Sequence, residues 1–208
     1  MRLTKHGHAC VALEYAGARV VIDPGGWTEP ESVEGATAVL ITHEHPDHWN
    51  AGLLRRTDAP IHTIAAVAAV LPDDLRERTQ VVAPGDRLDL GLPVEVVGEK
   101  HAIIHGELPH FDNSGYLLEV DGTRVFHPGD ALTVPSASVD VLLLPVSAPW
   151  LKSSECIDYA RAVAAPRNVA IHDRVYSAEG LGIIDGHLNR FLGERELSYE
   201  RLADGADL

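Results

Sequence analysis

The segment ATAVLITHEHPDH, residues 36–48, constrains the fold of this chain more than any other. Its first part is an apolar run rich in Val, Leu and Ile, which is typical of a buried strand. Its last six residues place His43, His45, Asp47 and His48 directly behind that strand. Bringing imidazole and carboxylate groups close together costs free energy unless a cation lies among them. The fold must therefore bring the end of this strand to an accessible rim, where further ligands can complete a cation site.

The spacing within the cluster predicts how its side chains divide. In an extended segment residues two apart point the same way, so His43, His45 and Asp47 are expected on one side and His48 on the other. One short segment can thus serve two adjacent cations. Imidazole nitrogen and carboxylate oxygen suit zinc, with manganese or iron as alternatives. The competing interpretation is a solvated, histidine-rich turn.

Three later segments offer the additional ligands that two cations require. PVEVVGEKH ends on His101, TRVFHPGD ends on Asp130, and RNVAIH ends on His172, each after a run that reads as a strand. His105 and His110 follow closely in HAIIHGELPH and compete with His101 for the same role. We prefer His101 because it comes directly at a strand end. Ligands donated from strand ends give a rigid site at a sheet edge.

The rest of the chain interleaves predicted strands and helices. Short runs rich in Val, Ile or Leu and bounded by Gly or Pro predict strands over 10–17, 18–26, 36–43, 79–85, 87–91, 93–101, 114–120, 123–130, 139–146 and 167–172. Helices are predicted over 48–57, 64–74, 153–165 and 183–193. The continuous apolar run of 139–146 suits a central strand buried on both faces. Since no linker or repeat interrupts the pattern, we predict one domain over residues 1–208, with helices packed against internal sheets.

Charge and cysteine content narrow the possible partners and compartments. Thirty-one acidic residues against seventeen basic ones give a formal net charge of -14, which repels phosphate backbones and anionic membrane surfaces. We therefore expect no nucleic acid and no membrane as partner, but a small-molecule substrate. Two cysteines, Cys10 and Cys156, offer no disulfide framework, and no apolar run has the length of a signal peptide or a membrane span. A cytoplasmic protein is the expectation.

On the motif HEHPDH the chain resembles the metallo-β-lactamase superfamily, whose signature is His-x-His-x-Asp-His. The likeness extends along the chain, because KHGHACVALEYAGARVVIDPG, HPGDALT and VAIHD follow the family's order. These segments are similar to the branch that includes ascorbate phosphate lactonase and small metal-dependent hydrolases. The resemblance implies an α/β fold, the four-layer αββα sandwich. It also implies that members of this branch often assemble, so a homo-oligomer is compatible with it.

The resemblance implies a ligand for each motif position. His43, His45 and His101 would bind a first metal, Asp47, His48 and His172 a second, and Asp130 would bridge the two. The family often has Thr after the bridging Asp, where this chain has Ala131, so a hydrogen bond beside the site is in question. His8 occupies a position that the branch often fills with histidine. Both a role beside the metal site and a purely structural role are compatible with this position. Asp23 is expected to fix a turn, and Trp150 to pack in the core or to wall the pocket.

This pattern predicts a dinuclear metal-dependent hydrolase with two divalent metal ions, zinc first, with manganese or iron as alternatives. Two closely spaced cations can share one water and lower its pKa enough to supply hydroxide at neutral pH. The expected reaction uses this metal-bridging hydroxide to cleave a small ester, lactone, amide or phosphoester. Asp47 is assigned a catalytic role besides its role as a ligand, because it can orient the hydroxide and take its proton. The alternatives are an iron-dependent oxidoreductase on the same fold, such as a sulfur dioxygenase or a diiron electron-transfer enzyme, and a metal-stabilised binding module.

Overall fold

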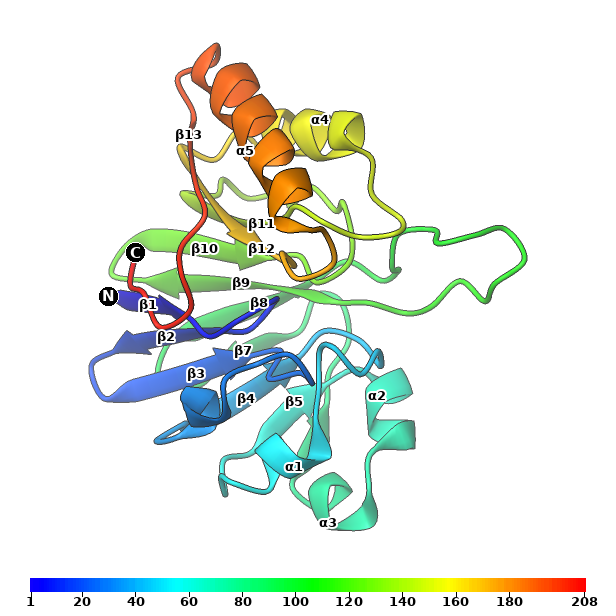
Figure 1. The fold of residues 1–208 in the computed structure, drawn as a ribbon. Helices are drawn as coiled ribbons and strands as arrows, with labels where there is room; N and C mark the ends of the chain where they lie inside the picture. The colour runs from blue at the N-terminus through cyan, green and yellow to red at the C-terminus, as the bar shows by residue number, and fades with distance from the viewer.

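Two β-sheets lie face to face in the computed structural model, which describes residues 1–208, and helices cover their outer sides (Figure 1). The first sheet contains six strands in sequence order: β1 (Arg2–Lys5), β2 (Val11–Tyr15), β3 (Ala18–Ile22), β4 (Ala38–Ile41), β5 (Ile61–Thr63) and β6 (Thr79–Val81). The first three pair antiparallel, and β3 to β6 pair parallel. The carboxyl ends of β3 and β4 therefore lie at the same edge of the sheet.

The second sheet contains seven strands in the order β13-β12-β11-β10-β9-β8-β7. Their bounds are β7 (Arg87–Asp89), β8 (Pro93–Val97), β9 (Gly115–Val120), β10 (Thr123–His127), β11 (Val141–Pro145), β12 (Arg167–Ile171) and β13 (Ser198–Glu200). Strands β10 to β13 are parallel. Every residue of β11 is buried, which confirms the prediction for 139–146. Leu143 packs between the two sheets while Leu142 and Leu144 pack beneath the helices, so alternate side chains fill two different cores.

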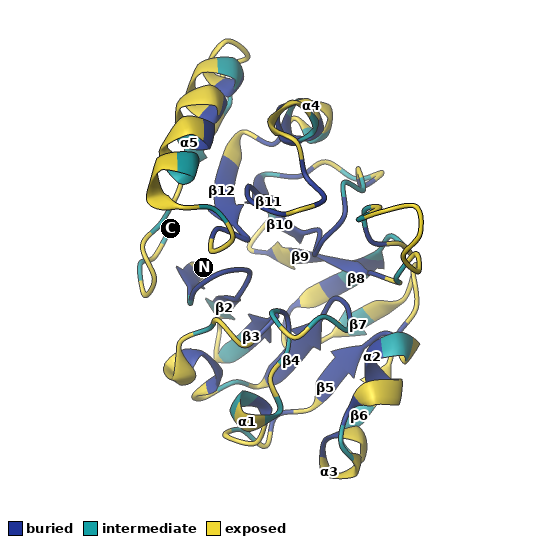
Figure 2. Cartoon of the chain, turned by 45° about the vertical axis from the view of Figure 1, so that its right-hand side comes forward, coloured by how far each residue is buried: buried dark blue, intermediate teal, exposed yellow.

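The helices form the two outer layers, as expected for an αββα sandwich. Their bounds are η1 (Pro30–Val33), a 3₁₀ helix, then α1 (Ala51–Leu54), α2 (Ala65–Val70), α3 (Asp73–Arg76), α4 (Ser153–Val163) and α5 (Ala178–Gly193). Side chains of α1 to α3 pack with β4 and β5, and those of α4 and α5 pack with β11 and β12. In Figure 2 the helices turn buried faces to the sheets and exposed faces outward. None of them combines the length and apolarity needed to cross a lipid bilayer.

Several element boundaries differ from the sequence predictions for local reasons. The helix predicted within 64–74 and expected to end at Pro72 does end there: α2 stops at Val70, and a separate helix, α3, begins after Pro72, which is its N-cap. The helix expected over 48–57 is limited to Ala51–Leu54, and Asn50 caps it. The last helix begins at Ala178 instead of residue 183, since the Ser177 hydroxyl accepts a hydrogen bond from the Gly180 N–H at 3.3 Å. Strands β1, β5 and β13 were not predicted.

The C-terminal tail, residues 201–208, returns to the first strand of the chain. The Lys5 N–H donates to the Ala206 carbonyl at 3.1 Å, and the Leu208 N–H donates to the Leu3 carbonyl at 2.9 Å. The buried Lys5 ammonium lies 2.9 Å from carboxylate oxygens of both Asp173 and Asp204. The two chain ends, which lie side by side in Figure 1, are thereby tied to the loop that follows β12.

Candidate metal centre

The predicted ligands lie together at one edge of the sandwich, beyond the ends of strands from both sheets. His43 follows β4 by two residues, Asp130 follows β10 by three, and His172 follows β12 directly. His101 lies in the β8–β9 connection, four residues after β8. Because parallel strands present their carboxyl ends at a common edge, residues far apart in the chain meet there. His101, Asp130 and His172 lie at the floor of a cleft of about 670 Å³.

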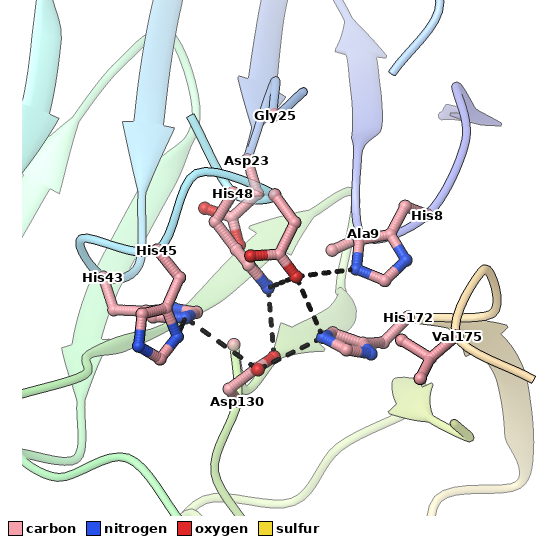
Figure 3. Close-up of polar contacts among 12 residues, drawn as sticks. His8, Ala9, Asp23, Gly25, His43, His45, His48, Asp130, His172 and Val175 are labelled. Carbon is pink, nitrogen blue, oxygen red and sulfur yellow. Dashed lines mark hydrogen bonds and ion pairs between the residues drawn. The ribbon is translucent and has the colours of Figure 1, made fainter. Parts of the chain in front are cut away.

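The side chains form two groups, and within each group the candidate ligand atoms lie within 4.8 Å of one another. The first group contains His43, His45, His101 and Asp130, and the second contains His8, Asp47, His48 and His172. All seven residues predicted from the sequence are brought together, and His8 is added to them. In Figure 3, His43 and His45 lie on one side of Asp130 and His172 on the other.

Asp130 lies between the two groups. One carboxylate oxygen, Oδ1, is 3.1 Å from His48 Nε2, and the other, Oδ2, is 3.1 Å from His172 Nε2 and 3.3 Å from His101 Nε2. The carboxylate therefore faces histidines of the first group and of the second at once. This is the placement that a bridging ligand requires.

The division expected from an extended segment was wrong. The segment bends at residues 43 and 44 and turns at 46–48, where the His48 N–H donates to the His45 carbonyl at 3.0 Å. The turn breaks the two-residue alternation, so Asp47 lies beside His48 and not beside His43. The structure groups Asp47 with His48 and His172, together with His8.

Hydrogen bonds outside the site fix the orientation of three histidines. In each, Nδ1 lies within hydrogen-bond distance of an oxygen: His48 of Asp23 Oδ2 at 2.7 Å, His101 of the Ala102 carbonyl at 2.5 Å, and His172 of the Ser147 carbonyl at 2.5 Å. These acceptors require a proton on Nδ1, which leaves Nε2 free to present a lone pair to the site. Metal-binding histidines in proteins are usually held in this way.

The nitrogen and oxygen atoms that point into the site show whether these residues could bind a cation. Nε2 of His48, His101 and His172 and Oδ1 of Asp130 are all buried without a hydrogen-bond partner. Leaving a buried polar atom unpaired costs about 1–3 kcal/mol. A cation among them would satisfy all four atoms. The donor set of imidazole nitrogens and carboxylates fits zinc, manganese or iron.

Asp23 supports the site from behind, which the sequence prediction captured only in part. Its buried carboxylate accepts hydrogen bonds from the Thr42 N–H at 2.8 Å and from the Thr42 hydroxyl at 2.7 Å. These contacts anchor the backbone just before the motif, as a turn-fixing residue would. The additional bond to His48 Nδ1 makes Asp23 a positioning residue for a candidate ligand.

His8 lies in the connection between β1 and β2 and reaches Asp47. Its ring is fully buried, with Nε2 at 3.1 Å from Asp47 Oδ2. Burial lowers the pKa of His8 to about 4, although the hydrogen bond to Asp47 opposes the shift. The ring is therefore neutral at pH 7, and its Nδ1 accepts from the Arg174 N–H at 3.4 Å. The remaining proton lies on Nε2, which donates to Asp47.

The other histidines lie outside both groups. His105 and His110 are exposed in the β8–β9 connection, and His110 Nε2 lies 2.8 Å from the His101 carbonyl. Neither competes with His101 for the position in the site. His127 is a satisfied core histidine, since its Nε2 lies 2.8 Å from the Ala9 carbonyl. His62 is buried as well, and neither of its ring nitrogens has a hydrogen-bond partner.

Residues 2–172, which are most of the chain, match the sequence model of a protein family, the beta-lactamase superfamily domain. The chain belongs to the metallo-β-lactamase superfamily. Protein Rv0786c of Mycobacterium tuberculosis is 41% identical over 194 residues, covering 90% of this chain and 91% of the relative. The UPF0173 metal-dependent hydrolase of Methanosphaerula palustris is 30% identical over 193 residues, covering 86% of each chain. These are relatives over nearly the whole length.

The solved structures agree on the fold. The metallo-beta-lactamase fold protein YhfI of Bacillus subtilis superposes with a TM-score of 0.75 at 13% identity, covering 100% of this chain and 98% of its own. At that identity the likeness shows the fold alone. Together with the layer order and the strand order, it confirms the αββα sandwich of the metallo-β-lactamase superfamily.

The position after Asp130 departs from the usual pattern of the superfamily, and Trp150 supplies a donor nearby. Ala131 has no side-chain hydroxyl, but the Trp150 indole N–H donates to Asp130 Oδ2 at 3.1 Å. Trp150 also packs in the core beneath α4 while it lines the cleft. Both interpretations of this tryptophan therefore apply.

The pKa values of the side chains are shifted differently in the two groups of candidate ligands. Burial lowers the pKa of His43 and His45, and the neighbouring histidines add to the effect, so both rings are neutral. In the second group, burial also lowers the pKa of His172, but Asp130 and Asp47 outweigh it and raise the pKa to about 9. Burial by itself would raise the pKa of Asp47, but the neighbouring His172 and His8 rings outweigh it, so that pKa is lowered. Protons and cations therefore compete for the second group.

The affinity of the second group for zinc is expected to rise with pH up to about pH 9. The pKa of His172 lies above neutrality, at about 9, so below that pH a cation must displace the proton before it can bind Nε2. Each displaced proton weakens the apparent affinity by about tenfold per pH unit as the pH falls. Calorimetric titration with zinc at several pH values, in buffers of different ionisation heats, measures both affinity and proton release. A constant affinity without proton release would contradict this account.

Proposed function

We propose that this member of the metallo-β-lactamase superfamily is a dinuclear metal-dependent hydrolase that cleaves a small ester, lactone, amide or phosphoester. One observation carries the proposal. Three histidine Nε2 atoms and Asp130 Oδ1 are buried, unpartnered and turned toward one another, and Asp130 faces both groups. Four such atoms would destabilise the fold unless cations joined them.

The seven predicted residues divide between two cation positions. We assign His43, His45 and His101 to the first, Asp47, His48 and His172 to the second, and Asp130 to both. Zinc is the first candidate, and manganese or iron fit the same donors. Cations bound there would polarise the scissile bond and lower the pKa of water enough to supply a nucleophile at neutral pH.

Asp47 is the carboxylate that can exchange protons with solvent. Its side chain is 20% exposed, whereas that of Asp130 is only 3% exposed. Asp47 is ionised because its pKa is lowered, so it can accept the proton of the attacking water but does not retain it. The water oxygen bonds to the carbonyl or phosphoryl centre, the bond to the leaving atom breaks, and the proton passes to that atom. His8 holds Asp47 in place for this step.

Hydrolysis is favoured over the oxidoreductase alternative by the ligand set. A one-metal dioxygenase needs a single group of ligands, but here the second group retains Asp47, His48 and His172 in addition to His8. These residues would have no role in a centre with one iron. An iron-loaded sample that consumes oxygen with a thiol substrate but hydrolyses nothing would support the alternative instead.

Replacing His45 by alanine is expected to lower metal-dependent hydrolysis by about a hundredfold and to reduce the metal bound per chain. His45 is only half-buried, so the fold should tolerate the change. Protein stripped with a chelator and reloaded separately with zinc, manganese or iron is screened on lactones, phosphodiesters, thioesters and β-lactams. Metal content and thermal unfolding are measured on the same samples.

His105→Ala is the matched control, because His105 is an exposed histidine outside both groups. It should leave activity, metal content and unfolding temperature unchanged. If the parent protein binds two metals and hydrolyses no substrate class, the proposed function is wrong. If His45→Ala keeps full activity, the assignment of the first cation position is wrong.

A further inference from the structure

The three tryptophans of the chain all line the same cleft. Trp27 comes from the loop after β3, Trp49 follows the motif, and Trp150 precedes α4. Aromatic residues make up only 5% of the sequence, so their concentration here is not a consequence of abundance. Ile104 and Val175 add aliphatic wall. The cleft thus combines a polar floor with largely apolar walls.

The walls offer few free hydrogen-bonding groups. The Trp49 indole N–H donates to the Glu44 carbonyl at 2.9 Å, and that of Trp150 donates to Asp130. Both rings therefore present apolar carbon surface to the cleft. Apart from the two ligand groups and the tryptophans, the one polar side chain of the lining is Asn50, whose Oδ1 already accepts from the Leu53 N–H at 3.1 Å. Polar recognition is concentrated at the floor.

No lysine or arginine lines the cleft. The nearby Arg174 is paired with Glu29 and Asp204, and Lys100 of the β8–β9 connection is paired with Asp112. An anionic substituent away from the floor would find no cationic partner, and the formal net charge of -14 adds to its cost. The walls therefore select against phosphate and carboxylate substituents.

Apolar side chains remain exposed where they would meet a ligand. Trp27 is 46% exposed and Val175 is 39% exposed, although both belong to the cleft lining. The edge of the His8 ring contacts Trp27, with ring centroids 4.7 Å apart, so the indole is held by a residue that also holds Asp47. Exposed apolar surface around a polar centre marks a ligand-binding site.

We propose that the substrate is a neutral ester, lactone or amide with an aromatic or alkyl substituent, and not one that carries an anionic substituent such as a phosphate or a carboxylate. This inference rests on the proposed hydrolase function and narrows it. The carbonyl group lies at the floor, and the substituent packs against Trp27 and Trp49. The water oxygen bonds to the carbonyl carbon, the bond from that carbon to the leaving oxygen or nitrogen breaks, and the water proton passes to the leaving atom. The products are an acid and an alcohol or amine, or a hydroxy acid from a lactone.

A substrate series tests the charge and the size of the substituent. Zinc-loaded protein is assayed with 4-nitrophenyl esters of increasing acyl length, with alkyl-substituted lactones, and with bis(4-nitrophenyl) phosphate and 4-nitrophenyl phosphate. We expect kcat/KM for the neutral esters to exceed that for both phosphates by at least about a hundredfold. KM should fall by about threefold per added methylene until the cleft is filled.

Trp27→Ala tests the wall directly. It should raise KM for the longer esters by about tenfold and leave kcat within about threefold, and Trp27→Phe should restore most of the affinity. Tyr15→Ala removes an exposed aromatic ring outside the cleft lining and should change neither constant. Because all three tryptophans line the cleft, 4-nitrobenzyl alcohol should quench intrinsic fluorescence saturably, and Trp27→Ala should weaken its binding.

The outcomes separate the two proposals. Hydrolysis that favours the phosphates, or a KM for long esters that is unchanged in Trp27→Ala, overturns the substrate class and leaves the hydrolase function intact. Absence of hydrolysis for every class, with metal bound, overturns the hydrolase function and the substrate class together. A preference for neutral esters, a KM effect confined to Trp27 and saturable quenching support the inference.

Discussion

Asp130→Asn is expected to lower hydrolysis by at least about a thousandfold, because losing the ligand that we propose is shared by two cations should exceed the 10- to 100-fold effects of outer contacts. Its two oxygens face His48 and His172 at 3.1 Å each, and Oδ2 also faces His101 at 3.3 Å. The amide removes the negative charge and places an N–H₂ group where one oxygen faces an Nε2 lone pair. Metal analysis should show the loss of at least one ion per chain.

Asp121→Asn is the matched control for this substitution. Asp121 lies exposed in the tight turn between β9 and β10 with a φ of 52°, a conformation that asparagine adopts readily. The control should keep full activity and metal content. If Asp130→Asn still binds two metals and retains activity within tenfold of the parent, Asp130 does not bridge the centre.

Asp23→Asn is expected to weaken metal binding in the second group by about 10- to 100-fold, although Asp23 is not itself a candidate ligand. Asparagine can still accept from the Thr42 N–H through one oxygen. Its amide N–H₂ would replace Oδ2, which now faces the Thr42 hydroxyl at 2.7 Å and His48 Nδ1 at 2.7 Å. Donor then meets donor, the His48 ring loses its orientation, and the unfolding free energy should fall by about 1–3 kcal/mol.

Asp140→Asn separates the loss of stability from the loss of metal. Asp140 Oδ2 also accepts a backbone hydrogen bond, from the Arg124 N–H at 2.8 Å, but Asp140 lies just before β11, away from the site. It should affect thermal unfolding at most modestly and leave the zinc affinity unchanged in calorimetry. If Asp23→Asn unfolds at a lower temperature yet binds zinc as tightly as the parent, Asp23 is purely structural.

The sequence predicted those parts of the fold whose local pattern is strong. The run of 139–146 reads as a strand buried on both faces, and β11 is buried at every position. β5 and β13, with the sequences IHT and SYE, contain no run of Val, Ile or Leu, which was the signal for the predicted strands, and their pairing with β4 and β12 creates them. The start of α5 was missed because Gly180 and Gly182 suggest a loop, whereas the Ser177 cap and packing against α4 and β13 extend the helix.

The sequence predicted which residues form the candidate site more completely than it predicted how they are arranged. The motif and the strand ends identified seven residues that the structure brings together. Alternation placed Asp47 with the wrong neighbours, because a hydrogen-bonded turn at His45 and His48 is invisible to residue spacing. The contacts of His8 with Asp47 and of Trp150 with Asp130 join residues 39 and 20 positions apart. Such contacts depend on how the sheets pack, which local patterns do not encode.

The C-terminal tail also has a consequence for self-association. β1 is the outer strand of the first sheet, and an open strand edge offers unpaired N–H and C=O groups to any other chain. Here the tail occupies that edge through backbone hydrogen bonds at Leu3 and Lys5, and Asp207 adds side-chain bonds to Thr4 and Arg2. The protein thereby closes its own β edge against strand-to-strand aggregation. An oligomer of this chain would have to form through another surface.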